Sequence, residues 1–233
     1  LLSAAATYTS AMDADPQGLA YDGTNIWVSE SYSAQIRKLD TSTLAVSNTY
    51  AINEGIGAMA YDSGYLYICD RGTNEIIKWD TSTHAEVLRI DCPRFPVDVL
   101  VQNGLVFVAG VEAVGVFNAT TGAEVLTTTG RAYARSRRAL VVSGDNVAFA
   151  DPVGGQLVLL NGTTGAEVRR LDISGIIAVS GGTTDHLFAA VRAGGSAVET
   201  RAYGDNADLT GLTLKVYQLS ETVGRGYPAE VAL

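Results

Sequence analysis

Short apolar runs alternate with turn residues along most of the chain, and the unit Ile56–Phe95 shows this pattern most clearly. Each of its runs is bounded by Asp, Asn, Gly or Ser, and the runs are Gly57–Tyr61, Leu66–Cys69, Ile76–Trp79 and Glu86–Ile90. Alternation of apolar and polar residues between such turn formers is typical of short β-strands joined by tight connections. The unit therefore predicts a four-stranded antiparallel meander.

The turn after the third run recurs along the chain. In each copy an Asp or Asn is followed by hydroxyl residues, and in the later copies by Gly, at Asp40–Thr43, Asp80–Thr83, Asn118–Gly122 and Asn161–Gly165. The first residues of these turns are separated by 40, 38 and 43 residues. A period of about forty residues built from four-stranded meanders is the pattern of a propeller blade. We therefore expect an all-β fold, a β-propeller of four-stranded antiparallel blades.

The repeat divides the chain into about five blades and a partial sixth, within one domain of residues 1–233. The blades are expected near residues 16–55, 56–95, 96–136, 137–176 and 177–227. Residues 1–15 would supply a terminal closing strand, and residues 228–233 resemble the start of a further strand. The ring is then either five-bladed with an overlapping terminus or six-bladed and incomplete in this chain, and we favour the second arrangement.

Blade 5 departs from the repeat. Residues 192–212 stand where the other blades have a short connection between their second and third strands. Long insertions on a rigid scaffold usually carry binding or assembly contacts. We expect this insertion to contribute to a contact surface.

Charge narrows the classes of partner. The net charge is −9 and the pI is near 4.6, which argues against the phosphate backbone of a nucleic acid and against an anionic membrane surface. No apolar run reaches the roughly 18–20 residues that a membrane-spanning helix needs. A protein or glycan partner, and no membrane insertion, is therefore expected.

One stretch resembles a known repeat. In Leu66–Ile76 an apolar strand ends in Asp, a Gly/Asn loop follows, and an apolar residue restarts the chain, which resembles the NHL repeat. The turns that begin at Asp40, Asp80, Asn118 and Asn161 look equally like YVTN-type surface-propeller repeats. The resemblance covers about residues 16–191 and implies a propeller. Such families include extracellular binding propellers, protein-interaction scaffolds and a few hydrolases or lyases.

Arginine is concentrated in the loops that follow the second strand of a blade or connect one blade to the next. These loops hold eight of the sixteen basic residues, namely Arg71, Arg94, Arg131, Arg135, Arg137, Arg138, Arg192 and Arg225. Because arginine binds carboxylates, sulfates and phosphates through a bidentate fork, we expect this face to bind an acidic protein or an anionic glycan. The alternative is local pairing with Asp70, Asp91, Glu112 and Asp151.

Two features favour an extracellular or cell-surface protein: a pair of cysteines that could form a disulfide, and two sequons that could carry glycans. Cys69 closes a second strand and Cys92 opens the next blade-to-blade loop, so a bridge between them is expected, with two free thiols as the alternative. Asn118 and Asn161 each begin an Asn-x-Thr glycosylation sequon in an exposed turn. The same residues also suit a tight turn without any glycan.

No catalytic residue, metal site or cofactor is expected. His84 and His186 fall in turns without ligand partners at useful spacing, and strand aromatics such as Trp27, Trp79 and Phe107 are expected to pack between blades. We therefore favour a non-catalytic interaction or structural module. The alternatives are a lactonase-type or hydrolase-type enzyme with a metal at the channel mouth, and a subunit of a larger surface assembly or filament.

Overall fold

The computed structural model describes residues 15–129, 139–173, 176–181, 186–192 and 212–218. Nineteen strands in these ranges form five antiparallel sheets. Within each sheet the strands lie side by side in chain order, so each sheet is a simple meander. Among the described residues no helix is long and apolar enough to cross a membrane.

Each sheet is one blade, numbered here in chain order. Blade 1 consists of β1 (Pro16–Tyr21), β2 (Asn25–Glu30), β3 (Gln35–Asp40) and β4 (Val46–Ala51). Blade 2 consists of β5 (Ile56–Asp62), β6 (Tyr65–Asp70), β7 (Glu75–Asp80) and β8 (Ala85–Asp91). Blade 3 consists of β9 (Asp98–Gln102), β10 (Leu105–Ala109), β11 (Ala113–Asn118) and β12 (Glu124–Thr129).

The remaining strands form the last two blades. Blade 4 consists of β13 (Leu140–Ser143), β14 (Asn146–Asp151), β15 (Gln156–Asn161) and β16 (Glu167–Asp172). In blade 5 three strands are described, β17 (Ile176–Gly181), β18 (His186–Arg192) and β19 (Leu212–Gln218). The expected closing strand at residues 1–15, the strand start at 228–233 and all but the ends of the 192–212 insertion lie outside the described residues.

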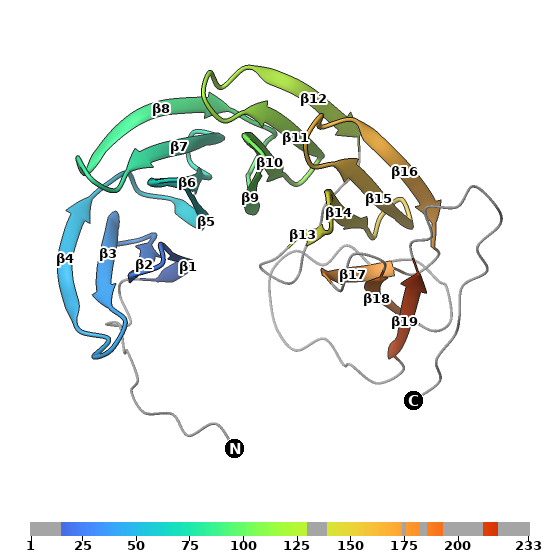
Figure 1. Cartoon of the computed structure of the whole chain (residues 1–233), viewed down its shortest axis with the longest axis horizontal. Helices are drawn as coiled ribbons and strands as arrows, with labels where there is room; N and C mark the ends of the chain where they lie inside the picture. Colours follow the sequence, from blue (N-terminus) through green and yellow to red (C-terminus); the bar gives the residue numbers. More distant parts are fainter. Residues whose placement is uncertain (1–14, 130–138, 174–175, 182–185, 193–211, 219–233) are drawn as a thin grey trace.

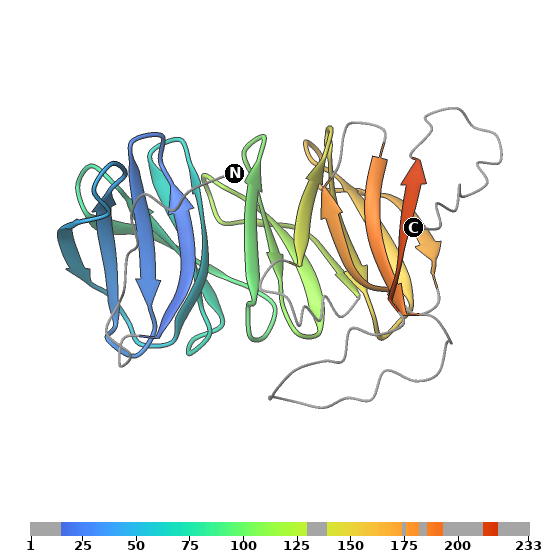
Figure 2. The same cartoon turned by 90° about the horizontal axis from the view of Figure 1, so that it is seen from below.

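The five blades follow an arc around a common axis, with blade 1 at one end and blade 5 at the other (Figure 1). The first strand of each blade lies innermost, and in blades 1 to 4 the fourth strand lies outermost. Figure 2 shows the inner strands running along that axis. Together with the antiparallel meanders, this arrangement confirms the predicted all-β propeller of four-stranded blades.

The apolar core lies between blades rather than within them. Side chains of blades 1 and 2 form one buried cluster around Trp27 and Trp79. Phe117 belongs to the cluster between blades 2 and 3, and Phe107 and Phe149 to that between blades 3 and 4. A smaller cluster joins blade 4 to Ile173 and Ile176. These five aromatic side chains thus fill the space between twisted sheets, as predicted from the sequence.

The turn after the third strand has the same side-chain cap in four blades. The Oδ1 atom of Asp40 accepts hydrogen bonds from the backbone N–H groups of Ser42 and Thr43, both at 2.9 Å. The carboxylate of Asp80 and the amide oxygens of Asn118 and Asn161 accept the two equivalent bonds, at 2.7–3.0 Å. An Asp or Asn at this position satisfies backbone donors that a tight turn leaves free.

The fifth residue of these turns has a positive φ in every copy. In blades 3 and 4 it is glycine, with φ of 74° at Gly122 and 75° at Gly165. In blades 1 and 2 it is Leu44, with φ of 56°, and His84, with φ of 58°. A leucine in this left-handed region is strained, because its Cβ approaches the backbone. The repeat therefore contains two turns with glycine at this position and two in which a residue with a Cβ atom adopts the same left-handed conformation.

Candidate functional site

The loops after the second strands and the connections between blades lie on the same face of the propeller. Backbone hydrogen bonds join them, from Arg71 N to Gly55 O at 3.1 Å and from Val111 N to Arg94 O at 3.1 Å. We call this surface the loop face; its described parts are the segments 31–34, 52–55, 71–74, 92–97, 110–112 and 152–155. Because its loops are bonded to one another, the loop face is a preformed surface.

The structure brings two of the predicted arginines, Arg71 and Arg94, together on the loop face. Arg192 ends β18, and its side chain is outside the described part of the chain. The other predicted arginines also lie outside that part: Arg131, Arg135, Arg137, Arg138 and Arg225. Of the arginines predicted to bind an anionic partner, the structure therefore describes the side chains of two, Arg71 and Arg94.

Arg94 has the local partner that the alternative interpretation requires. Its Nη1 atom lies 3.5 Å from Oε1 of Glu112, and both side chains are more than half exposed. Exposed ion pairs of this kind contribute little, about 0–1 kcal/mol, because water screens them. Arg94 is therefore held only weakly by Glu112.

Arg71 differs from Arg94 because the described groups that its side chain contacts, Gln17 and Phe95, are neutral. The side chain is half-buried, and Nη1 donates to Oε1 of Gln17 at 3.3 Å. The guanidinium carbon lies 5.6 Å from the centre of the Phe95 ring, and Nε is buried without an acceptor. Among the described residues no carboxylate forms an ion pair with Arg71.

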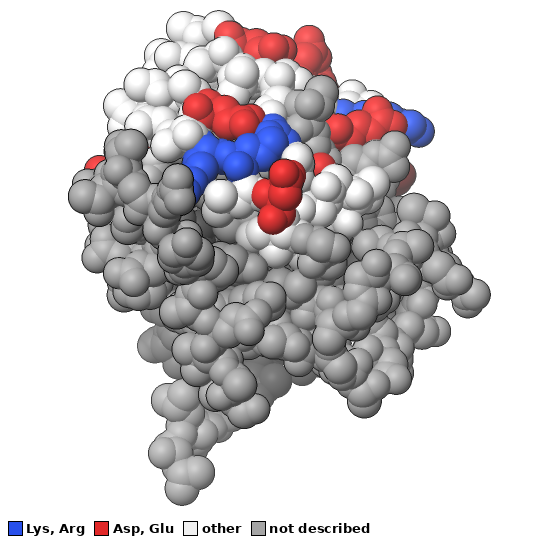
Figure 3. Space-filling model, turned by 90° about the vertical axis from the view of Figure 1, so that its right-hand side faces the viewer, with Lys and Arg blue, Asp and Glu red and all other residues white. Residues whose placement is uncertain are grey.

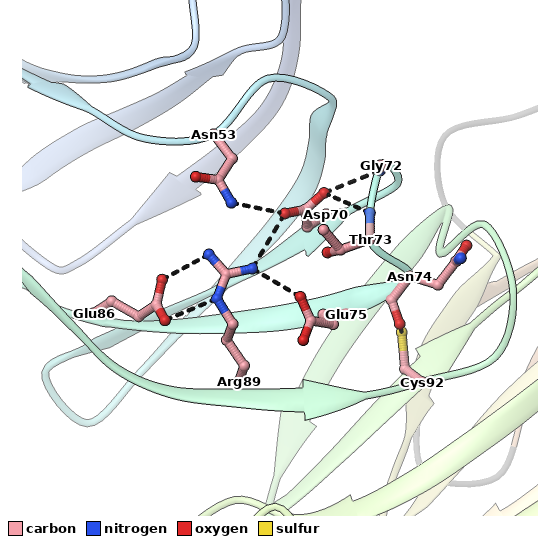
Figure 4. Close-up of polar contacts among 9 residues, drawn as sticks. All are labelled: Asn53, Asp70, Gly72, Thr73, Asn74, Glu75, Glu86, Arg89 and Cys92. Atoms are coloured by element: carbon pink, nitrogen blue, oxygen red, sulfur yellow. Dashed lines mark hydrogen bonds and ion pairs between the residues drawn. The ribbon is translucent and has the colours of Figure 1, made fainter.

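Asp70, at the end of β6, is fully buried and is the centre of a polar network (Figure 4). Its Oδ1 atom accepts backbone N–H bonds from Gly72 and Thr73, which fixes the following loop. Its Oδ2 atom accepts a bond from Asn53 at 3.3 Å and faces Nη1 of Arg89 at 3.4 Å. The strand-ending Asp of the predicted repeat therefore shapes the loop face.

Arg89, on β8, connects this network to two further acids. Its Nε and Nη2 atoms donate to the two carboxylate oxygens of Glu86, both at 2.8 Å, and Nη1 donates to Glu75 at 2.8 Å. Hydrogen bonds from Thr73 and then Arg89 lower the pKa of Glu75. The hydrogen bond with Glu86 raises the pKa of Arg89. The negative charges of the acids around Asp70 are thus compensated by Arg89 of the same blade.

Blade 4 repeats the same arginine fork. Arg170 donates from Nε and Nη2 to Glu167 at 3.0 and 2.7 Å, and from Nη1 to Gln156 at 2.7 Å. The sequence analysis missed Arg89 and Arg170 because it considered only arginines in loops. The signal is present in the similar segments Ala85–Asp91 and Ala166–Asp172, in which Glu and Arg occupy matching positions.

The strand-ending acid and its arginine occur together. Blades 2 and 4 have both, at Asp70 with Arg89 and at Asp151 with Arg170, whereas blade 3 has Gly110 after its second strand and Thr127 at the arginine position. In blade 1 the buried Glu30 pairs with Arg37 on the neighbouring strand, at 2.8 Å. A buried carboxylate at this position needs a compensating charge, and blades 1, 2 and 4 each have an arginine that can supply it.

Acidic and basic groups also lie side by side on the outer surface. Figure 3 shows the side of the molecule near β16, where blue and red groups are neighbours on the described part of the surface. The ion pair between Arg170 and Glu167 on β16, at 2.7 Å, is one such arrangement. This pairing distinguishes the outer strands from Arg71, which forms no ion pair with any residue that the structure describes.

The inner strands line a cavity of about 730 Å³ on the propeller axis. Its walls are mainly apolar, with Gln17 and Asp98 as polar members near the loop face and Leu19, Tyr21, Met59, Tyr61, Leu100 and Leu140 further along the inner strands. The carboxylate of Asp98 already accepts backbone bonds from Ala139 and Leu140. Within the described residues, no group of three or more His, Cys, Asp or Glu side chains is arranged to hold a metal ion.

The disulfide predicted between Cys69 and Cys92 is not formed in this structure, in which both are free thiols. Cys69 is fully buried in the apolar cluster between blades 2 and 3, and Cys92 packs against that cluster. The Cys92 Sγ atom lies 3.3 Å from the backbone oxygen of Asn74, to which its S–H donates. Burial raises the pKa of Cys92 to about 12 and that of Cys69 well above its ordinary value.

The predicted glycosylation residues, Asn118 and Asn161, occupy the turns described above and are half-buried. Their side-chain oxygens accept the turn hydrogen bonds. This geometry explains the Asn-x-Thr sequences by turn structure, and glycosylation stays a prediction. His84 lies in a turn on the opposite face, where its ring stacks on Tyr50 at 4.4 Å; the side chain of His186 is outside the described part.

The comparisons with known proteins identify the family. Residues 10–203 match the family described as outer membrane protein assembly factor BamB. The chain belongs to the BamB family. The match confirms a propeller repeat protein, and the narrower NHL or YVTN type stays a prediction. No curated protein sequence matches this BamB-family chain.

Solved structures show the same fold. Hydrazine synthase from Kuenenia stuttgartiensis has a TM-score of 0.67 at 16% identity, over 97% of this chain and 68% of that one. BamB from Moraxella catarrhalis has a TM-score of 0.57 at 18% identity, over 78% and 59%. A streptogramin B lyase has a TM-score of 0.62 at 12% identity, over 97% and 72%. The matched regions span about two thirds of these longer chains.

Proposed function

We propose that this BamB-family chain is a non-catalytic interaction module that binds a protein partner through its loop face. The family match over residues 10–203 carries the proposal, because the family is described as a protein assembly factor. Assembly of other proteins requires a surface that holds them in place. The loop face, whose loops are joined by backbone hydrogen bonds, supplies such a surface.

The exposed side chains of the loop face support a protein as the partner. Tyr32 is 75% exposed and Val153 is 50% exposed, and they occupy the same position in the loops of blades 1 and 4. Arg94 is exposed on the connection that enters blade 3. Tyrosine and arginine are enriched in protein interfaces. An exposed aliphatic residue such as Val153 suits a protein surface better than a glycan.

The location we propose is outside the cytoplasm. The family description refers to the outer membrane, which supports a periplasmic or cell-surface site of action. This is consistent with the extracellular location expected from the sequence. It also agrees with the partner class, because assembly factors of the outer membrane work on proteins beyond the inner membrane.

Site-specific photocrosslinking in the source cells tests the function. A photoreactive phenylalanine analogue replaces Tyr32 or Val153 on the loop face, and matched variants carry it at the exposed Ser42 or Ser82 in turns of the opposite face. After irradiation the adducts are identified by mass spectrometry. We expect the same protein to be captured from Tyr32 and Val153 and not from Ser42 or Ser82.

Two results would contradict the proposal. Equal capture from both faces would mean that the loop face has no special role. Absence of any adduct from the loop-face positions, in cells where the variants are exported and folded, would remove the interaction function. Circular dichroism of each purified variant provides the folding control.

A further inference from the structure

We propose that Arg71 anchors a carboxylate-binding site at the mouth of the central channel, and that its ligand is a peptide carboxylate presented by the partner. The identity of the partner rests on the proposed function, whereas the binding site itself does not. The proposal depends on the free donors of Arg71, on the residues that orient it and on its position at the cavity rim.

Most donors of Arg71 are unused. A guanidinium group has five N–H donors and no acceptor, and one of them, on Nη1, bonds to Gln17. The Nε atom is buried without an acceptor, so a carboxylate arriving from outside would bond to the terminal Nη1 and Nη2 groups. A half-buried cation whose one described side-chain hydrogen bond goes to a neutral amide oxygen is poorly compensated, because water is partly excluded and no described carboxylate pairs with it. An external carboxylate would complete the charge pairing.

The neighbouring acids in the described part of the chain are kept from pairing with Arg71. Asp15 lies close, but the side chain of Gln17 stands between them, with its amide nitrogen bonded to Asp15 and its oxygen to Arg71. Asp70 is engaged by the following loop and by Arg89. Asp98 accepts the N–H groups of the blade 3 to blade 4 connection. The neighbouring carboxylates are therefore committed to the fold.

Other residues fix the orientation of the guanidinium group. At position 57 a Cβ atom would lie 2.9 Å from Cζ, Nε and Nη2 of Arg71, so Gly57 leaves the space in which the group lies. The Phe95 ring covers part of the guanidinium at 5.6 Å. Phe95 has a φ of 54°, and its N–H donates to the side chain of Asn74 at 2.7 Å, which holds the ring there. The fork is thus preorganised before any ligand binds.

The position of Arg71 connects the site with the channel. Gln17, its hydrogen-bond partner, lines the channel and joins it to Arg71 on the loop face. A ligand bound to Arg71 therefore sits where the cavity opens. The planar fork of arginine matches a carboxylate in two parallel bonds. A phosphate dianion would need more positive charge than one arginine supplies, so a carboxylate fits best.

Nuclear magnetic resonance tests the site without the natural partner. The Nε–Hε resonance of Arg71 in ¹⁵N-labelled protein is assigned by its loss in Arg71→Lys. It is followed during titration with acetate, with N-acetyl-Gly-Asp-Gly-amide and with N-acetyl-triglycine, at constant ionic strength set with NaCl. The first peptide carries a side-chain carboxylate and the second a C-terminal one. We expect a saturable shift with at least one peptide, and the stronger binder identifies the source of the carboxylate.

Three variants make the result specific. Gln17→Glu places an internal carboxylate beside Arg71, and we expect it to weaken peptide binding at least tenfold. Arg71→Lys, in which binding is followed through backbone amides of residues 55–57, keeps the charge but loses the fork and should weaken binding similarly. Arg169→Ala removes an exposed arginine on the outer strand β16 and should leave binding unchanged.

The outcomes separate this proposal from the proposed function. No saturable shift with either peptide in the folded protein would overturn the carboxylate site, even if photocrosslinking captures a partner on the loop face. Equal binding by the Gln17→Glu variant would also overturn it, because the site would then not depend on Arg71. A saturable shift lost in both Arg71→Lys and Gln17→Glu supports it, even if no partner is captured.

Discussion

The Oδ2 atom of Asp98 accepts a hydrogen bond from the backbone N–H of Ala139 at 2.7 Å, which joins the inner strand of blade 3 to the connection that enters blade 4. The same oxygen accepts the N–H of Leu140 at 2.9 Å. Between blades 1 and 2 a related contact runs from the Ser29 hydroxyl to the Gly57 carbonyl oxygen at 2.6 Å. Hydrogen bonds thus hold neighbouring blades together near the channel, in addition to the apolar clusters between the blades.

Replacing Asp98 should destabilise the protein strongly. Asp98→Ala leaves the buried N–H groups of Ala139 and Leu140 without their acceptor, and unsatisfied buried groups cost about 1–3 kcal/mol each. We expect a loss of about 3–5 kcal/mol in the free energy of unfolding, measured with urea. Asp98→Asn, which retains one oxygen, should lose less. Loss of under 1 kcal/mol in Asp98→Ala, similar to the exposed control Glu124→Ala, would contradict this role.

The capped turns should contribute to acid sensitivity. The Ser42 hydroxyl and the Thr43 donors lower the pKa of Asp40 to about 2, and Ser82 lowers the pKa of Asp80 in the same way. Because the folded pKa lies below the ordinary value of 3.8, this contribution is present above about pH 4 and is lost as pH falls towards 2. Asparagine accepts the same backbone bonds in blades 3 and 4.

The double variant Asp40→Asn, Asp80→Asn should therefore lose less stability between pH 4 and pH 2 than the natural sequence. Urea unfolding at several pH values in this range measures the difference. Asp91→Asn removes a charge outside the capped turns and serves as the control. An unchanged pH slope in the double variant would show that the caps do not titrate as described.

The strained turn in blade 1 gives a stability test with an internal reference. Leu44 has a φ of 56° where blades 3 and 4 have glycine. Replacement by glycine removes the left-handed strain, so we expect Leu44→Gly to be more stable than Leu44→Ala by about 0.5–1 kcal/mol. The alanine variant keeps the strain and loses the same side chain. Thermal and urea unfolding should agree, and a more stable alanine variant would contradict the assignment.

The two thiols should be protected in the folded protein. Because burial raises the pKa of Cys92 to about 12 and that of Cys69 well above its ordinary value, the thiolate population stays small up to pH 9. We expect slow reaction with a thiol reagent at pH 7–9 in native protein, and two reactive thiols per chain after unfolding without reductant. Cys92→Ser should leave one. No reactive thiol in the unfolded natural protein would instead support the disulfide predicted from the sequence.

The repeat could be predicted because its turns use a simple local chemistry. Asp40, Asp80, Asn118 and Asn161 satisfy nearby backbone donors, so their role is encoded within a few residues of each turn. The positions of the aromatic side chains between blades could be predicted for a similar reason, because alternation places them on one face of a strand. Local periodicity was sufficient for the propeller.

The site was less predictable because it depends on contacts between distant residues. Arg71 was expected on the loop face, but its unpaired state depends on Gln17, 54 residues earlier, and on Phe95 from the following connection. Arg89 was overlooked because it lies on an outer strand, although its fork reaches Asp70. The cysteines lie in one cluster, yet Cys92 bonds to Asn74. Such outcomes require side-chain positions in space.

The placement of the apolar clusters between blades has a consequence for repeat duplication and for the order in which the blades unfold. Among the described residues the buried clusters join neighbouring blades, so each inner blade depends on two described neighbours, whereas a blade at an end of the arc has one. Stability in such a chain is approximately a sum over adjacent pairs. Duplication of one forty-residue unit would therefore extend the arc by reusing an existing junction, and loss of structure would begin at the ends and advance one junction at a time.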